Sequence, residues 1–169
     1  MNSQEVVAFE NLPSLVGRRF ASDSFRVTQQ EVDTFEDITG VTTTYEDSLA
    51  ADYPEGMIEG FHSLALLDYL VHGLVRPDPV TCFTFNYGVD RVRFTAPLHT
   101  TDELYFTMEI RAAESRGKGY LMRYHCVIGA VGQERPGMVA EWLGLVLPRT
   151  TTEFRNKDRS SNPITFRKV

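Results

Sequence analysis

The 169-residue sequence has little of what marks the more easily identified classes of protein. It has only two cysteines, Cys82 and Cys126, and their separation fits neither a metal site nor a disulfide framework. Each lies in a strand-like run, so we expect two buried free thiols. No zinc spacing, phosphate-binding glycine loop or Gly-x-Ser-x-Gly elbow is present in the sequence. We therefore expect no metal and no bound cofactor.

An excess of positive charge is also missing. Lysine and arginine number 17 against 23 aspartates and glutamates, for a net charge of −6. A general nucleic-acid binder needs basic clusters for phosphate contacts, so that class is excluded, although a few local arginines could still meet the phosphates of a small ligand. The composition, 42% hydrophobic and 24% charged, is that of an ordinary globular domain.

Long apolar segments are missing too. The opening "MNSQEVVAFENLPSL" has neither the basic start nor the apolar stretch of a signal peptide. No run in the sequence approaches the length of a membrane span. We therefore expect a cytoplasmic protein without a membrane partner.

The first half of the chain reads as loop and helix. Residues up to about Asp23 are loop-like, and 24–28 alternate as a short strand. Thr28 is the predicted N-cap of the helix "QQEVDTFEDI", which Gly40 closes. A long apolar helix follows from about Met57 to Val75, and the prolines of "RPDPV" end it. Because its apolar residues fall on nearly every side, this helix should be buried.

The second half changes to the period of β-strands. Four long segments alternate and are rich in aromatic and β-branched residues: "CFTFNYGVDRVRFTAPL", "DELYFTMEIRAAES", "YLMRYHCVIGAVG" and "GMVAEWLGLVL". The short turns between them indicate a meander of antiparallel hairpins. We predict an α+β domain over residues 1–148 in which the sheet curls around the long helix, as in a hot-dog fold, followed by a polar tail over 149–169.

Several segments, in order, resemble the MaoC-like dehydratases, the R-specific enoyl-CoA hydratase branch of the hot-dog superfamily. They are "VGRRF", "EVDTFEDITG", "EGFHSLALLDYL", "NYGVDRVRFTAPL" and "VAEWLGLVLPR". The resemblance covers roughly Leu15 to Arg149, and "YGVDRVRFTAP" is its most specific part. It implies an acyl-thioester substrate on coenzyme A or an acyl carrier protein, so that coenzyme A or phosphopantetheine enters only as part of the substrate. It also implies at least a homodimer.

The sequence departs from this family at the catalytic pair. Hydratases of the family have an aspartate after the glycine that follows the first helix, and a histidine five residues later. Here the corresponding segment is Thr39-Gly40-Val41, and the histidine position falls on Glu46, or on Tyr45 if one residue is lost. A valine cannot exchange a proton, so hydration by the family's own residues is not expected. The fold can be inherited while the chemistry changes.

Three polar residues at the start of the long helix could supply another site. Glu59, His62 and Ser63 are spaced to share one helix face, and the resemblance places the thioester carbonyl at this end of the helix. In the functional interpretation Glu59 and His62 transfer protons, with Tyr45 or Glu46 reaching in from the preceding loop and Ser63 contacting the substrate. In the structural interpretation Glu59 caps the helix and His62 bonds a loop carbonyl. The sequence leaves both open.

The strand motif offers further candidates. The resemblance places an N–H donor to the thioester oxygen near Gly88 and Val89. Arg91 and Arg93 should point to one face of their strand, where they could pair with acidic neighbours or bind the phosphates of a carrier arm. Asp68 and His72 are expected to form an i,i+4 pair at a subunit seam.

Three hypotheses follow from the sequence. The first is an enzyme that hydrates, dehydrates or isomerises an acyl thioester with an altered active site, using His62, Glu59 and Tyr45. The second is a non-catalytic acyl-binding module or the structural subunit of a heteromer, which the missing aspartate and histidine favour. The third is a thioesterase in which Glu46 or Glu59 serves as the base.

Overall fold

The computed structural model of the protein describes residues 4–41, 54 and 56–149. The elements in chain order are β1 (Glu5–Val7), η1 (Phe9–Leu15), β2 (Arg19–Ala21), α1 (Gln29–Thr39), β3 (Met57–Ile58), α3 (Gly60–Ala65), α4 (Leu67–Leu74), β4 (Val75–Pro77), β5 (Cys82–Phe94), β6 (Leu98–His99), β7 (Leu104–Arg116), β8 (Gly119–Ala130) and β9 (Met138–Pro148).

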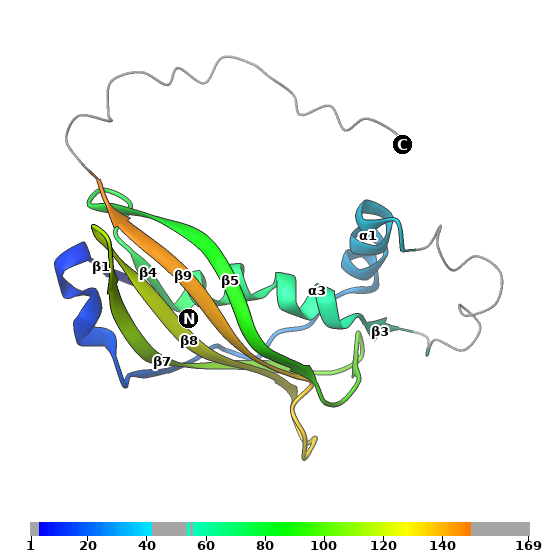
Figure 1. Ribbon diagram of the computed structural model, residues 1–169. Helices are drawn as coiled ribbons and strands as arrows, with labels where there is room; N and C mark the ends of the chain where they lie inside the picture. The colour runs from blue at the N-terminus through cyan, green and yellow to red at the C-terminus, as the bar shows by residue number, and fades with distance from the viewer. Residues whose placement is uncertain (1–3, 42–53, 55, 150–169) are drawn as a thin grey trace.

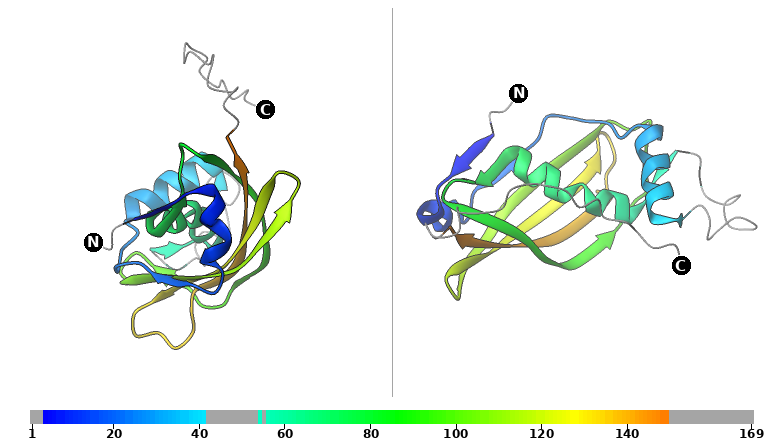
Figure 2. Two further views of the ribbon diagram at one scale, coloured as in Figure 1. Left: turned by 90° about the vertical axis from the view of Figure 1, so that its left-hand side faces the viewer. Right: turned by 90° about the horizontal axis from the view of Figure 1, so that it is seen from above.

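One antiparallel sheet curls around one helix. The five strands run in the order β2-β7-β8-β9-β5. Segments α3 and α4, together called the central helix below, lie in the hollow of this sheet, as the view along the helix in the left panel of Figure 2 makes plain. The predicted α+β arrangement is confirmed. Helix α1 lies beside the start of α3 (Figure 1).

The four long strands form as predicted, but they are not a simple meander. Strands β7, β8 and β9 are consecutive neighbours, whereas β5 pairs with β9 and not with β7. The chain therefore leaves β5 and crosses to the other side of the sheet before β7 begins. Among the described strands β5 pairs only with β9, so β5 forms one edge of the sheet. A local turn signal between β5 and β7 cannot reveal this crossover, because the pairing of β5 is decided by a strand some sixty residues away.

The core lies between the inner face of the sheet and the central helix. Along β7 buried and half-buried residues alternate, as the two-residue period of a strand requires. The helix contributes Leu67, Leu70 and Val71 to the same core cluster. The side chains that are almost fully shielded from solvent include Leu67, Val71, Phe106, Ile110, Met122, Ile128, Met138 and Val146.

The central helix begins later than the sequence suggests. Met57 and Ile58 pair with His99 and Leu98 as a short antiparallel ladder, so helix α3 starts only at Gly60. Leu66 joins α3 to α4 with a helical backbone: its N–H donates to His62 O at 3.2 Å, and its carbonyl accepts from Leu70 N–H at 2.9 Å.

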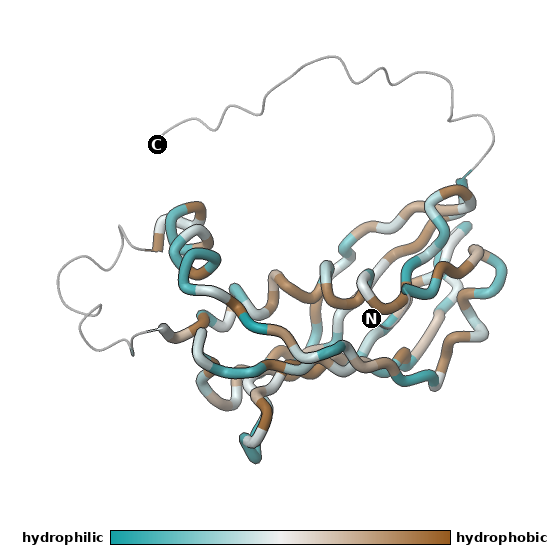
Figure 3. The backbone as a smooth tube through the Cα atoms, turned by 180° about the vertical axis from the view of Figure 1, so that it is seen from behind, coloured by the Kyte–Doolittle hydropathy of each residue, from teal (hydrophilic) through white to brown (hydrophobic). Residues whose placement is uncertain are grey.

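The expectation that the central helix is buried on every side is wrong. The helix is mostly hydrophobic in Figure 3, while α1 is mostly hydrophilic. Yet Phe61 is 71% exposed and Tyr69 is 77% exposed. One apolar side of the central helix therefore remains open, next to the edge strand β5.

The N-terminal segment is more ordered than the loop that its composition predicts. Strand β1 pairs in parallel with β4, and Leu12 and Leu15 of η1 are buried in the main core. The predicted strand over 24–28 is reduced to a single bridge between Phe25 and Leu104. Pairing with β7 instead uses β2, because Arg19–Ala21 lies in register with it.

Cys82 and Cys126 are both buried free thiols, as predicted. Burial raises the pKa of Cys126 to about 12, so this thiol is unreactive at neutral pH. Within the described part of the chain, no helix combines the length and the apolar character needed to cross a membrane. The predicted tail begins at Arg149, whose backbone N–H donates to Thr81 O at 2.8 Å; from 150 onward it lies outside the described residues and stays a prediction.

Candidate active site at the start of the central helix

The start of the central helix is shaped by glycine. Glu59 takes the N-cap position, but its side chain makes no capping hydrogen bond, so it is not the side-chain cap of the structural interpretation. A Cβ built on Gly60 would lie 2.8 to 2.9 Å from ring atoms of Phe94. Only glycine therefore lets the ring of Phe94, at the end of β5, lie against the first turn of the helix.

His62 is the most buried titratable side chain at this end of the molecule. It is 6% exposed, and its ring stacks on the ring of Phe35 from α1, with centroids 4.6 Å apart and planes 9° from parallel. Among the described residues Nδ1 has no hydrogen-bond partner. Burial lowers the pKa of His62, and the negative charge of Glu31 partly opposes this shift. A neutral imidazole at neutral pH with one unpaired ring nitrogen can accept a proton.

Glu31 is held rigidly by the first turn of α1. The backbone N–H and the hydroxyl of Thr28 both donate to Oε2 of Glu31, at 2.7 and 2.8 Å. Glu31 N–H in turn approaches Thr28 Oγ1 at 3.3 Å, which completes a capping box. These hydrogen bonds are the main reason that the pKa of Glu31 is lowered, and His62 contributes in the same direction.

The predicted contact between Glu59 and His62 is not formed. No hydrogen bond or ion pair joins these two described residues, and the charge that acts on His62 is that of Glu31. Glu59 instead lies in the electrostatic field of Glu36 on α1. Burial raises the pKa of Glu36, and the charge of Glu59 raises it further.

Ser63 lines a cavity of about 410 Å³ beside the helix start. Buried Ile58, Ser63 and Leu98 form its inner wall, and exposed Phe94 and Thr95 lie at its mouth. The lining residues are chiefly apolar, with the two hydroxyls of Ser63 and Thr95, the composition expected for a small-molecule site. His62 lies on another side of the helix, against α1, and is not among the lining residues.

Tyr45 and Glu46 lie outside the described residues, so their predicted roles stay predictions.

The candidates on β5 are not brought to this cavity. Gly88, Val89 and Arg91 line neither this cavity nor the one at the far end of the central helix described below. Arg91 has a positive φ of 52° within an irregularity between Asp90 and Arg93, so the two-residue period that would place Arg91 and Arg93 on one face is broken.

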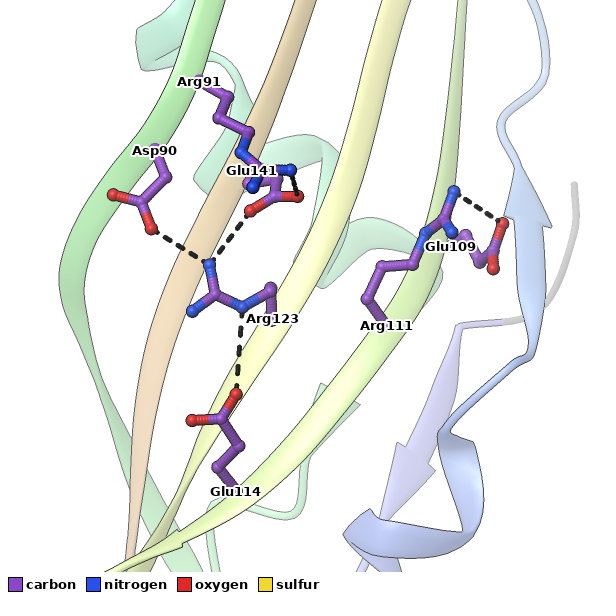
Figure 4. Close-up of polar contacts among 7 residues, drawn as sticks. All are labelled: Asp90, Arg91, Glu109, Arg111, Glu114, Arg123 and Glu141. Atoms are coloured by element: carbon purple, nitrogen blue, oxygen red, sulfur yellow. Dashed lines mark hydrogen bonds and ion pairs between the residues drawn. The ribbon is translucent and has the colours of Figure 1, made fainter.

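Arg91 joins a network of charges on the outer face of the sheet (Figure 4). Its guanidinium lies 3.5 Å from Glu141, and Arg123 lies 3.0 Å from both Glu141 and Asp90. The predicted pairing of Arg91 with an acidic neighbour is confirmed. A phosphate contact by Arg91 stays a prediction, and it would have to compete with Glu141.

A second cavity, of about 630 Å³, lies at the far end of the central helix. Asp68 and His72 line it and form the predicted i,i+4 pair, with Oδ1 and Nδ1 3.4 Å apart. Within the described part of the chain, no three His, Cys, Asp or Glu side chains are grouped to bind a metal ion.

Sequence reasoning missed Glu31, Phe35 and Glu36 as neighbours of the helix start. Thr28 was identified as the N-cap, and a glutamate three residues later is the usual second half of a capping box. That signal fixes the carboxylate of Glu31 locally. It does not say that α1 packs against His62.

The sequence of the chain is similar to those of several known proteins. No protein-family model matches the chain. The 3-hydroxyacyl-thioester dehydratase Z of Mycobacterium tuberculosis is 30% identical over 125 residues, which cover 71% of this chain and 82% of that protein. Nodulation protein N of Rhizobium leguminosarum is 24% identical over 147 residues, 83% of this chain and 91% of the relative.

Solved structures share the fold at lower identity. A monoamine oxidase regulatory protein from Archaeoglobus superposes with a TM-score of 0.66 at 16% identity, over 89% of this chain and 99% of that one. A MaoC-like dehydratase from Rhodospirillum rubrum gives 0.60 at 18% identity, over 80% and 94%. An R-hydratase from Pseudomonas aeruginosa gives 0.57 at 18% identity, over 89% and 92%.

Proposed function

Because the chain belongs to the MaoC-like dehydratase family of hot-dog proteins, as its sequence motifs predict, we propose that it hydrates, dehydrates or isomerises an acyl thioester at the start of the central helix. One observation carries the proposal: a buried imidazole with an unpaired ring nitrogen lies at the helix end where the resemblance puts the thioester. Neutral His62 is the proton acceptor in this scheme.

A dehydration can be written with these residues. His62 takes the proton from the carbon next to the thioester carbonyl, and the electron pair forms the new double bond as the β-hydroxyl leaves. In this scheme Glu59 delivers the proton that converts the leaving hydroxyl to water, and Glu36 is its neighbour on α1. Addition of water is the same sequence reversed. Ser63 contacts the far part of the acyl group in the cavity, on a different side of the helix start from His62. Tyr45 remains a further candidate for proton transfer.

The carrier of the acyl group is coenzyme A or an acyl carrier protein in this proposal. Both carry the acyl group as a thioester on a phosphopantetheine arm, and the site described above would contact only these shared parts. The relative named as a 3-hydroxyacyl-thioester dehydratase supports a thioester as the substrate in this proposal.

The proposed assembly is a homodimer formed along β5. Strand β5 is an edge of the sheet and exposes Phe85, Tyr87 and Val89. Next to it, the open side of the central helix exposes Phe61 and Tyr69. An unpaired edge beside exposed apolar side chains is a surface that a second chain can cover.

A non-catalytic acyl-binding subunit is the second candidate, and Val41 favours it. The family's hydratases have a carboxylate at this position, whereas valine offers no proton. Such a subunit would keep the cavity and bind the thioester without converting it. A thioesterase has less support, because its predicted base would be Glu46, outside the described residues, or Glu59.

Mass spectrometry in deuterated water separates these candidates. The purified protein is incubated with a panel of enoyl and 3-hydroxyacyl thioesters, beside His62→Ala and Glu59→Ala, with His72→Gln as the control histidine at the far end of the helix. We expect a water mass shift or deuterium incorporation that both site variants abolish and the control keeps. Binding by the wild-type protein with every mass unchanged would favour the acyl-binding subunit, and release of free acid would favour the thioesterase.

A further inference from the structure

The carboxylate of Glu31 is a fixed charge rather than a mobile one. It accepts hydrogen bonds from the backbone N–H and the hydroxyl of Thr28, so both its position and its ionised state are set by the capping box. The pKa of Glu31 is lowered for the same reason. A carboxylate held in this way does not exchange protons near neutral pH, but it acts on charges that appear beside it.

The same face of α1 covers His62. Residues four apart on a helix lie one above the other, so Glu31 and Phe35 share a face. Phe35 stacks on the imidazole of His62 at 4.6 Å, and this stack fixes the plane of the ring. Glu31 therefore lies one turn along α1 from the residue that holds the ring. No hydrogen bond joins its carboxylate to Nδ1 of His62, so Glu31 acts on the imidazole through its charge, which favours the charged form of both groups.

We propose that Glu31 is the positioning residue of His62, and that α1 supplies the carboxylate half of an acid–base pair that the family's own motif no longer provides. The inference rests on the proposed function and names the residue that makes His62 effective in it. In the resting protein burial keeps the imidazole neutral. When His62 accepts a proton, the fixed negative charge of Glu31 stabilises the imidazolium that forms.

Among the described residues, one charged group acts on His62. On α1 the facing charge is Glu31. Glu59, just before the helix that carries His62, also has a carboxylate, but its charge acts on Glu36. Phe35 and the buried core beneath the helix contribute no charge. Removal of Glu31 should therefore lower the pKa of His62 further, since only desolvation would remain.

Glu31→Gln tests the proposal without unmaking α1, because glutamine also serves as the third residue of a capping box. Asp33→Asn is the matched control, as it removes a negative charge from the same helix. The first readout is an NMR titration of the His62 imidazole in the full-length protein. We expect the titration midpoint to move to lower pH in Glu31→Gln and to change far less in Asp33→Asn.

The second readout is the pH profile of turnover. With a converted thioester, kcat of Glu31→Gln should fall by about tenfold, part of what a positioned acid–base group contributes, and the acidic limb of the profile should move with the NMR midpoint. If His62 titrates alike in the wild type and Glu31→Gln, the positioning role is wrong whatever the turnover. If the wild type converts no thioester, the proposed function fails, and the NMR titration alone still decides whether Glu31 acts on His62.

Discussion

The environment of the His62 ring sets how folding should depend on pH. Burial lowers the pKa of His62 in the folded protein, while in the unfolded chain the imidazole has its ordinary value of about 6.5. Between those two values the unfolded chain binds a proton that the folded protein does not. The stability that depends on a neutral His62 is therefore complete above about pH 6.5 and decreases as the pH falls toward the folded pKa.

His62→Phe isolates this contribution, since phenylalanine can keep the stack on Phe35 and has no proton to bind. We expect the free energy of unfolding of the wild type, measured in urea, to decrease between pH 7 and pH 5. In His62→Phe the decrease over the same interval should be smaller. Equal slopes for the two proteins would mean that His62 is not held neutral by its surroundings.

For single residues of the site, some features could be predicted from the sequence and others could not. The choice of His62, Glu59 and Ser63 followed from their spacing and from the resemblance. His62 and Ser63 are buried, but the predicted shared face is not formed, because Glu59 precedes the helix and His62 faces α1 while Ser63 lines the cavity.

The partner of His62 could not be found in that way. Glu31 lies on a different element, and which face of α1 packs inward depends on tertiary contacts. Val32 and Ile38 are both apolar residues of α1, yet Val32 is 2% exposed and Ile38 is 81% exposed.

At the scale of elements, α1 should depend strongly on its cap. Thr28 provides three of the hydrogen bonds at the helix start, and Gly40 ends the helix with a φ of 72°. Loss of a threonine N-cap costs about 1 kcal/mol of stability. Thr28→Ala should therefore lower the free energy of unfolding by about that amount. It should also weaken the acid dependence due to Glu31, whose lowered pKa stabilises the fold at neutral pH and ceases to do so as the pH falls through it.

Thr34→Ala is the control for the cap. It removes the same hydroxyl from the interior of α1, where Oγ1 bonds only to Gln30 O, and alanine is the better helix former. Chemical denaturation followed by circular dichroism should show no loss for Thr34→Ala. An equal loss in both variants would contradict a special role for the cap.

The elements differ in how readily their ends follow from sequence. Both ends of α1 were predicted, because capping is a local interaction. The start of the central helix was not, because Met57 and Ile58 are drawn into a ladder with β6, forty residues further along the chain. The irregularities of β5 were also missed, since a bulge depends on the partner strand β9 and leaves no fixed signal in its own strand.

At the scale of the whole molecule, the edge position of β5 has the widest consequence. In a simple meander β5 would pair with β7. The crossover instead leaves it with β9 on one side and no strand on the other among the described residues. The side chains that would be buried in a wider sheet are then exposed, and they lie next to the apolar open side of the central helix.

The proposed homodimer along β5 would cover the apolar surface that one chain leaves exposed. Phe85 on β5 is 53% exposed, and lysine at this position would place a charge where a second sheet edge must approach. Light scattering coupled to size exclusion should give twice the mass of one chain for the wild type and the mass of one chain for Phe85→Lys. Val131→Lys replaces an equally exposed apolar residue in the turn between β8 and β9 and should remain a dimer. A monomeric wild type, or a dimer that survives Phe85→Lys, would contradict a homodimer along β5. The exposed apolar side chains at this edge would then have to be covered by a different partner.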